Sequence, residues 1–142
     1  MEGFRRGIGV ELRAFVRDAG TRRALPFTAY VGVPGSTRTA LPHDPGHDQV
    51  LRADLVERAV DGLPQQVVDR AGACAWVTRP GDLALDTRDL DWLAATRTGF
   101  GRHDLVLPAF FVLGRQGWLE AISGRTRRWH RVRPHRRDLE RS

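Results

Sequence analysis

The sequence predicts a single-domain α/β protein in which one mixed sheet and two main helices follow the order ββαβαββ(β), the last strand lying in an Arg-rich end. A length of 142 residues with 41% hydrophobic side chains is enough for one domain with a buried core. Alternating apolar side chains indicate the strands, and apolar side chains three or four residues apart indicate the helices. We expect the α/β domain to span residues 1–124 and an Arg-rich C-terminal segment to span residues 125–142.

A β-hairpin is predicted near the N-terminus. Apolar and other side chains alternate over Ile8–Val16, which is the period of a half-buried strand. A turn is expected at Asp18–Thr21, and the alternation resumes over Leu25–Val33. Pro34 and Gly35 end this second strand, and a polar loop is expected to lead from there to the first helix.

The first helix is predicted over residues 49–61. Asp48 precedes it as a fair N-cap, and Gly62 is expected to stop it. Pro64 then starts a short second helical turn, because proline suits the beginning of a helix.

A buried strand over Ala73–Val77 precedes the second main helix, which is expected near residues 87–99. Asp86 is the predicted N-cap, and Asp89 stands at the third helical position, where an acid favours the helix dipole. The apolar face of this helix is expected to consist of Leu90, Leu93 and Ala94, with Trp92 at its border.

Two strands and a tight turn are predicted after the second helix. Leu105–Leu113 is an apolar strand, Gly114–Gly117 is a hairpin turn, and Trp118–Ile122 pairs back. Arg127–Arg133 adds a last edge strand. The core of the whole domain is expected to include Val10, Leu12, Phe27, Val31, Leu55, Val77, Leu93, Phe110 and Val112.

Positive charge is concentrated at the C-terminal end. All 23 basic residues are arginine, and the chain contains neither lysine nor asparagine, which indicates a GC-rich genome. Residues 1–122 contain 15 arginines and 15 Asp or Glu residues, so their formal charges cancel. Residues 123–142 contain 8 arginines against Asp138 and Glu140, and carry the whole net charge of +6. Such a local excess predicts either an anionic partner or a solvated end.

Several classes of protein are disfavoured by what the sequence lacks. No apolar run approaches the length of about 18 residues that a membrane span needs, and the N-terminus has no apolar core of a signal peptide. Cys74 is the only cysteine, so neither an internal disulfide nor a multi-cysteine metal site can form. We therefore expect a cytoplasmic protein with no cofactor and no metal.

The familiar catalytic and metal-binding motifs are incomplete in this chain. The segment His43–Asp48 has two histidines and two aspartates, but Pro-Gly between the histidines makes a turn, so we interpret it as a polar loop that ends in a helix cap. No serine stands in G-x-S-x-G, and Gly32–Thr39 lacks the G-K-[ST] ending of a phosphate loop. Cys74 lies within an apolar strand, where cysteine is usually inert.

The turn Arg79-Pro80-Gly81-Asp82 is a second position at which a site is conceivable. It lies between a strand end and a helix start, which is where open α/β sheets place their ligands. Arg79 and Asp82 would face a crevice there, and Arg115 would reach it from the later hairpin. The alternative interpretation is a well-made turn with a local ion pair.

The stretch around Pro80-Gly81-Asp82, with the strand and helix order about it, resembles the JAB/MPN metalloprotease-like fold in its RadC-type branch. The strand and hairpin from Leu107 to Trp118 resemble the next elements of that branch. The likeness covers about residues 50–120.

The metal ligands of that family have no counterpart in this chain. The family pattern is His-x-His-Pro, then Ser, then Asp three residues later; Val77 and Arg79 stand at the two His positions. The Ser and Asp positions fall on Thr87 and Leu90, or on Asp86 and Asp89 after a slip of one residue. The resemblance therefore implies a fold relative without the zinc site, and no catalytic residue is carried over.

These observations favour a non-catalytic binding module over an enzyme. Its anionic partner, nucleic acid or an acidic protein, would be contacted through guanidinium groups and an aromatic ring that stacks on a base. The contact residues are expected to be Arg125, Arg127, Arg128, Trp129, Arg131, Arg133, Arg136 and Arg137. If the segment is a strand, one face has Arg127, Trp129, Arg131 and Arg133, and the other has Thr126, Arg128, His130 and Val132.

Other interpretations stay open. One is a small hydrolase-like enzyme with its site at the Arg79–Asp82 turn, and another is a structural subunit of a larger complex. The arginines of the C-terminal segment also suit an edge strand whose solvated charges prevent edge-to-edge aggregation.

Overall fold

A six-stranded mixed sheet forms the centre of the protein, in a computed structural model that describes residues 2–20 and 26–129. Its order is β2-β1-β3-β4-β5-β6, and within the described residues β3 and β4 are the one parallel pair. The strands are β1 (Thr28–Gly32), β2 (Arg38–Pro42), β3 (Cys74–Thr78), β4 (Phe110–Gly114), β5 (Gly117–Glu120) and β6 (Thr126–Arg128).

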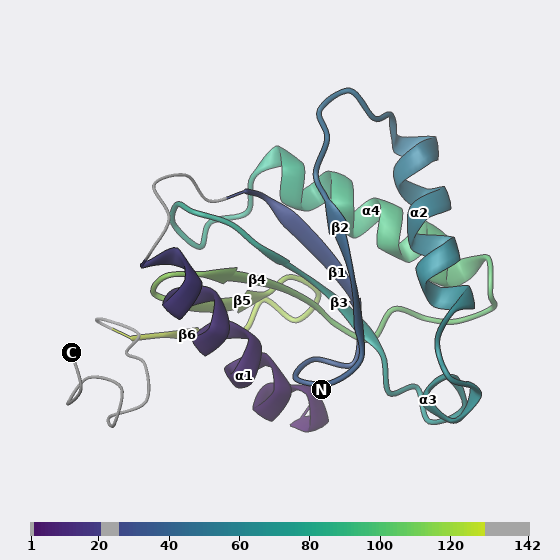
Figure 1. Ribbon diagram of the computed structural model, residues 1–142, viewed down its shortest axis with the longest axis horizontal. Helices are drawn as coiled ribbons and strands as arrows, with labels where there is room; N and C mark the ends of the chain where they lie inside the picture. The colour runs from purple at the N-terminus through teal and green to yellow at the C-terminus, as the bar shows by residue number, and fades with distance from the viewer. Residues whose placement is uncertain (1, 21–25, 130–142) are drawn as a thin grey trace.

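Helices cover both faces of this sheet. They are α1 (Glu2–Ala19), α2 (Gln49–Asp61), α3 (Gln65–Asp69) and α4 (Thr87–Gly101). Figure 1 shows α1 on one face of the sheet and the pair α2 and α4 on the other. The predicted α/β class with one mixed sheet is confirmed.

The first predicted strand is wrong, because residues 8–16 belong to helix α1. In a segment where apolar residues alternate, every second apolar residue is four positions from the next. Over a short window the pattern therefore fits both the two-residue period of a strand and the spacing along one face of a helix. The stripe that α1 turns toward the protein extends at both ends beyond the predicted strand and consists of Phe4, Ile8, Leu12, Val16 and Ala19. Val10, a predicted core residue, lies off this stripe and is 43% exposed.

A glycine inside α1 helps to explain why the sequence pattern does not reveal the helix. At Gly7 the helix passes so close to the loop between β1 and β2 that a Cβ atom would collide with the carbonyl oxygen of Pro34. Glycine lowers helix propensity by about 1 kcal/mol. The close packing therefore requires a residue that weakens the local helix signal.

The N-terminal hairpin is built from later segments than the predicted one. β1 lies within the second predicted strand, but it pairs with β2, in the segment that the sequence indicates to be a polar loop. β2 is an edge strand in which Leu41 alone is buried, so its sequence has no clear alternation. The order ββαβαββ(β) therefore describes the chain after α1.

Both main helices are confirmed together with their caps. The Asp48 carboxylate accepts a hydrogen bond from the Leu51 N–H at 2.8 Å. Asp86 and Asp89 form a reciprocal capping box at the start of α4. The predicted apolar face of α4 is wrong in part: Leu90 and Ala94 are exposed, whereas Trp92 is fully buried.

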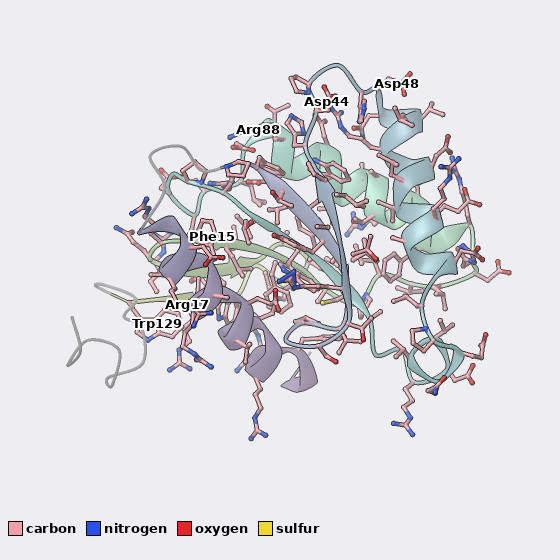
Figure 2. The ribbon with its side chains drawn as sticks, viewed as in Figure 1. Phe15, Arg17, Asp44, Asp48, Arg88 and Trp129 are labelled. Atoms are coloured by element: carbon pink, nitrogen blue, oxygen red, sulfur yellow. The ribbon has the colours of Figure 1, made fainter. Side chains whose placement is uncertain are left out.

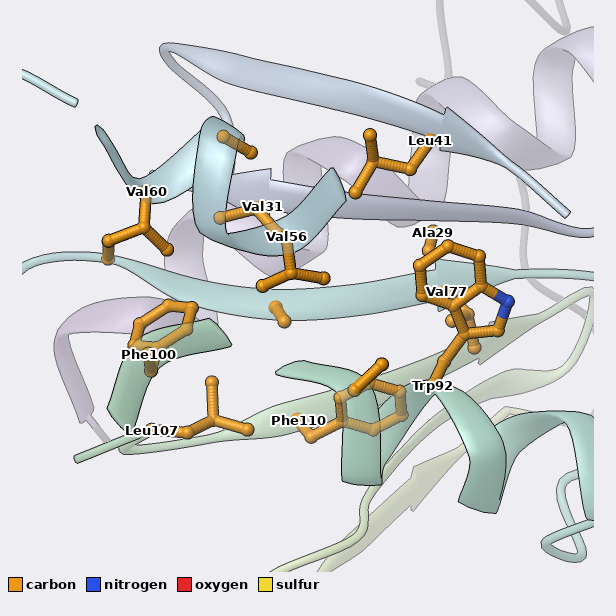
Figure 3. Close-up of a cluster of buried hydrophobic side chains, with 14 of the residues drawn as sticks. Ala29, Val31, Leu41, Val56, Val60, Val77, Trp92, Phe100, Leu107 and Phe110 are labelled. Carbon is orange, nitrogen blue, oxygen red and sulfur yellow. The ribbon is translucent and has the colours of Figure 1, made fainter. Parts of the chain in front are cut away.

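The central strands are buried on both faces because helices lie on both sides of them. In β3, Ala75 and Val77 point toward α2 and α4, whereas Cys74 and Trp76 point toward α1. Figure 3 shows the larger cluster, in which Val56 and Val60 of α2 and Trp92 and Phe100 of α4 pack against the sheet. The other predicted core residues are buried or pack partly buried against this core: Leu12, Phe27, Val31, Leu55, Val77, Leu93, Phe110 and Val112.

The C-terminal strands follow the predicted order. The turn between β4 and β5 closes with Gly114 opposite Gly117, as expected. β6 pairs with β5 as an edge strand, and the part of the predicted strand from residue 130 onward lies outside the described residues. Among the helices of the described residues, none has the length and apolar character needed to cross a membrane.

Substitution of Gly99 tests the contact between α2 and α4. A Cβ atom there would lie 2.7 Å from the Val56 Cβ atom and 3.0 Å from the Glu57 backbone nitrogen. We expect Gly99→Ala to lower the free energy of unfolding by about 1–3 kcal/mol through overpacking. The matched control is Gly101→Ala in the same helix, where nothing lies within 4 Å; it should leave stability unchanged or raise it by up to about 1 kcal/mol. Urea titrations that rank the two variants the other way would contradict this packing.

Glu120 is a buried carboxylate that connects β5 to the following loop and to β4. It accepts backbone hydrogen bonds from Phe110 and Ile122 at 2.9 Å and from Ser123 at 2.7 Å. Burial alone would raise the pKa of Glu120, but these N–H donors hold that pKa below its ordinary value. The folded state therefore favours the ionised carboxylate.

The stability of the protein should fall with acid partly through Glu120. Because its pKa is lower in the folded state, its contribution is present above its ordinary pKa of 4.5 and is lost as pH falls through the folded value. We expect Glu120→Gln to cost about 2 kcal/mol at neutral pH and to flatten the loss of stability between neutral and acid pH. Glu57, whose side chain is 41% exposed, is the control, and Glu57→Gln should change both quantities little. Equal acid dependence in Glu120→Gln and the unmodified protein would refute this account.

Candidate functional site

A basic groove runs between α1 and the β5–β6 edge of the sheet. It has a volume of about 350 Å³. Its lining consists of Arg5, Arg6, Gly9, Leu12, Arg13, Trp118, Arg127 and Trp129. Four of these described residues are arginine, two are tryptophan, and none is a carboxylate. We call this feature the basic groove.

Helix α1 forms one wall of the basic groove. Arg5, Gly9 and Arg13 are four residues apart, so they lie along one side of the helix. Gly9 leaves room between the two arginines, because a Cβ atom there would meet only the Arg13 Nη1 atom, at 3.4 Å. Leu12, which is buried, contributes apolar surface at the base of the wall.

Strands β5 and β6 form the opposite side of the basic groove. Trp118 is the register partner of Arg127, so both side chains point to the same face of the sheet. Trp118 is only 3% exposed, and the Arg5 guanidinium carbon lies 5.9 Å from the centre of its ring. The floor of the groove is therefore aromatic and carries positive charge above it.

Trp129 lines the groove and lies beside α1 (Figure 2). Its backbone N–H donates to the Gln116 carbonyl at 2.8 Å, which extends the pairing of the edge strand by one residue. The residue is 37% exposed, and the Arg127 guanidinium carbon lies 5.0 Å from the ring centre. The prediction that Arg127 and Trp129 share a face is confirmed, and Arg128, on the other face, does not line the groove.

The distribution of charge along the sequence does not reveal the α1 half of this site. Arg5, Arg6 and Arg13 belong to a region whose total charge is zero, and the alternation around them predicts a strand where the structure has a helix. Their helical spacing was the available signal. Of the other predicted contacts, Arg125 is exposed just before β6, and those outside the described residues are Arg131, Arg133, Arg136 and Arg137.

Arg79, at the turn considered as an alternative site, is a buried structural residue. Its Nε and Nη2 atoms donate to the two Asp89 carboxylate oxygens at 2.9 and 2.6 Å. The remaining donors bind the carbonyl oxygens of Pro80, Asp82 and Ala84. The hydrogen bonds to Asp89 raise the pKa of Arg79, and all five N–H groups of the guanidinium are engaged. Arg79 therefore has no donor left for a ligand.

Of the other two residues of the predicted crevice, Asp82 meets Arg79 through its backbone carbonyl, and the Arg115 side chain bonds elsewhere. Asp82 is exposed, and its carboxylate accepts from the Ala84 N–H at 3.1 Å. Arg115 reaches away toward the end of α1, where its Nη2 atom donates to the Ala19 carbonyl at 3.3 Å. The structure of this segment therefore agrees with the alternative interpretation, a well-made turn with a local ion pair.

The histidine-rich loop before α2 serves the fold. The His43 Nδ1 atom accepts a hydrogen bond from the Trp92 Nε1–H group at 3.1 Å, which ties the loop to α4. Burial, and then the charges of Arg52 and Arg88, lower the pKa of His43, so the ring is held neutral. His47 instead lies 3.4 Å from the carboxylate of Asp44.

The described part of the chain contains neither a cluster of metal ligands nor an activated thiol. Within residues 2–20 and 26–129, no three His, Cys, Asp or Glu side chains gather as a metal site would require. Burial raises the pKa of the Cys74 thiol, which disfavours the reactive thiolate. The expectations of no metal and no cofactor stay predictions.

Comparison of the chain with protein-family models, curated proteins and solved structures finds no match. The resemblance to the JAB/MPN fold is not tested by these comparisons and stays a prediction. The basic groove therefore has to be interpreted from its own chemistry.

Removal of one partner of the Arg79–Asp89 pair tests its structural role. We expect Asp89→Asn to lower the free energy of unfolding by about 3–5 kcal/mol, because the buried guanidinium keeps only the more distant Asp86 carboxylate, at 3.7 Å, as a counter-charge. Asp91→Asn, two residues further along α4 on a partly exposed side chain, is the control and should cost at most about 0.5 kcal/mol. Chemical denaturation that shows equal midpoints for the two variants would contradict a structural role for the pair.

Proposed function

We propose that this chain is a non-catalytic binding module that binds nucleic acid along the basic groove. The observation that carries the proposal is the composition of the groove, in which four arginines and two tryptophans meet with no carboxylate among the described lining residues. Guanidinium groups bind phosphate oxygens through paired N–H donors, and indole rings offer surfaces for bases. A chain of phosphates and bases satisfies both kinds of group.

The distribution of charge over the molecule supports the same proposal. On the other side of the sheet, α2 presents Asp54, Glu57 and Asp61. The first two bind Arg102 at 2.6 and 2.8 Å, which offsets the charge of that arginine, and Arg58 lines the same hollow. A polyanion is attracted to the groove side and is not attracted to α2.

The sequence beyond the groove supports an extended contact. The sequence after Trp129 includes Arg131, Arg133, Arg136 and Arg137, which add positive charge to the C-terminal segment. The proposal places this binding in the cytoplasm, where a reducing environment suits a single free cysteine.

Salt dependence of nucleic-acid binding tests the proposal. The intact protein should bind a labelled oligonucleotide at low salt, with a log–log slope of affinity against salt of about −3 to −4 if about four phosphates are neutralised. Combined substitution of Arg6, Arg13 and Arg127 by Ala should weaken binding and make the slope shallower by about 1 for each arginine removed. Fluorescence anisotropy over a salt series measures both quantities.

A charge-matched control separates the groove from net charge. Substitution of Arg58, Arg70 and Arg97 by Ala removes the same charge from exposed positions that do not line the groove. This control should retain most of the affinity and the slope. Absence of binding to single- and double-stranded DNA and RNA at low salt, or equal losses in the two triple variants, would overturn the proposal.

A further inference from the structure

We infer that the ligand of the basic groove is single-stranded nucleic acid, one base of which stacks on the exposed ring of Trp129 while its phosphates lie against the arginines of α1. This inference rests on the proposed function and names the form of nucleic acid that the groove selects.

The first observation is the way in which Trp129 is held. Its backbone is anchored by the hydrogen bond to Gln116, yet the residue remains 37% exposed where it lines the groove. The neighbouring Trp118 shows that an indole on the same side of the sheet can be buried almost completely, at 3% exposure. An anchored but exposed indole beside a hollow is the arrangement of a stacking platform.

The second observation is the charge next to that ring. The Arg127 guanidinium lies 5.0 Å from the centre of the Trp129 ring, within the range of a cation–π contact. A nucleotide whose base stacks on Trp129 carries its phosphate only a few bonds away from the base. Arg127 and the arginines of α1 therefore lie where they would bind the phosphates on either side of a stacked base.

The third observation is the size and shape of the groove. A volume of about 350 Å³ lies at the lower end of pockets that hold a drug-sized molecule, and a nucleotide is of that size. Gly9 keeps the hollow open between Arg5 and Arg13. A duplex keeps its bases stacked inside and offers only phosphate and groove edges, so its bases do not reach Trp129 unless one is flipped out. The combination of hollow, ring and charge therefore fits a single strand.

Binding of three probes of equal length tests this inference. They are an oligothymidine strand, a strand of the same length without bases, and a duplex, each measured at the same low salt. We expect the base-bearing strand to bind more tightly than both the abasic strand and the duplex. An RNA strand of the same length, measured beside the DNA strand, shows whether the 2′-hydroxyl contributes.

Two variants keep the net charge and remove the stacking site. Trp129→Leu removes the aromatic face at an exposed position, and Gly9→Leu fills the hollow from the α1 side. Each should weaken binding of the base-bearing strand by roughly 5- to 100-fold and leave the abasic strand nearly unchanged. Trp129→Phe should restore most of the affinity, and Arg97→Ala is the control outside the groove.

The outcomes separate this inference from the proposed function. If the abasic strand or the duplex binds as tightly as the base-bearing strand, with a salt slope that the groove arginines control, single-strand selection is wrong and the proposed function stands. Unchanged affinity of Trp129→Leu for the base-bearing strand has the same meaning. If no probe binds, or if polyglutamate competes in the groove as well as the strands do, the proposed function fails as well.

Discussion

The arrangement of α4 depends on the buried pair between Arg79 and Asp89. The carboxylate is fully buried and the arginine is 2% exposed, which is tolerable only because the loop after β3 supplies a partner for every remaining guanidinium donor. The pair joins the end of a central strand to the first turn of the helix. From that anchor α4 runs across the sheet and meets Val56 of α2 at Gly99, where the two helices are in close contact. The larger core cluster lies beneath this contact.

The arginines of this protein lie in two kinds of surroundings, which differ in the local supply of carboxylates. Arg79 and Arg102 each have acidic partners, so their charges are used within the molecule. The basic groove has no carboxylate among the described residues that line it, so the formal charge of its lining is positive. Counting charge over residues 1–122 hides this difference, because a sum of zero says nothing about where the positive and negative groups lie.

The success of each prediction depends on how local its signal is. α2 and α4 are predictable because Asp48 and Asp86 satisfy backbone donors within three residues of themselves. Helix α1 resembles a strand in sequence because its central apolar residues fit two periods, and Gly7 weakens its helix propensity for a reason that lies in the β1–β2 loop. β2 is not predicted because an edge strand with one buried residue shows little alternation of apolar and polar side chains.

For the candidate site, the sequence alone determined that a basic end exists and that Arg127 and Trp129 fall on one face of an edge strand, since side chains alternate along any strand. It also determined the α/β class and the buried central strands, which follow from periodicity and composition. Only the tertiary structure decided that Arg5, Arg6 and Arg13, at the opposite end of the chain, face that strand across a hollow. No local rule relates the two segments, because they meet through the packing of α1 on the sheet, which is set by apolar contacts on the buried side of the helix.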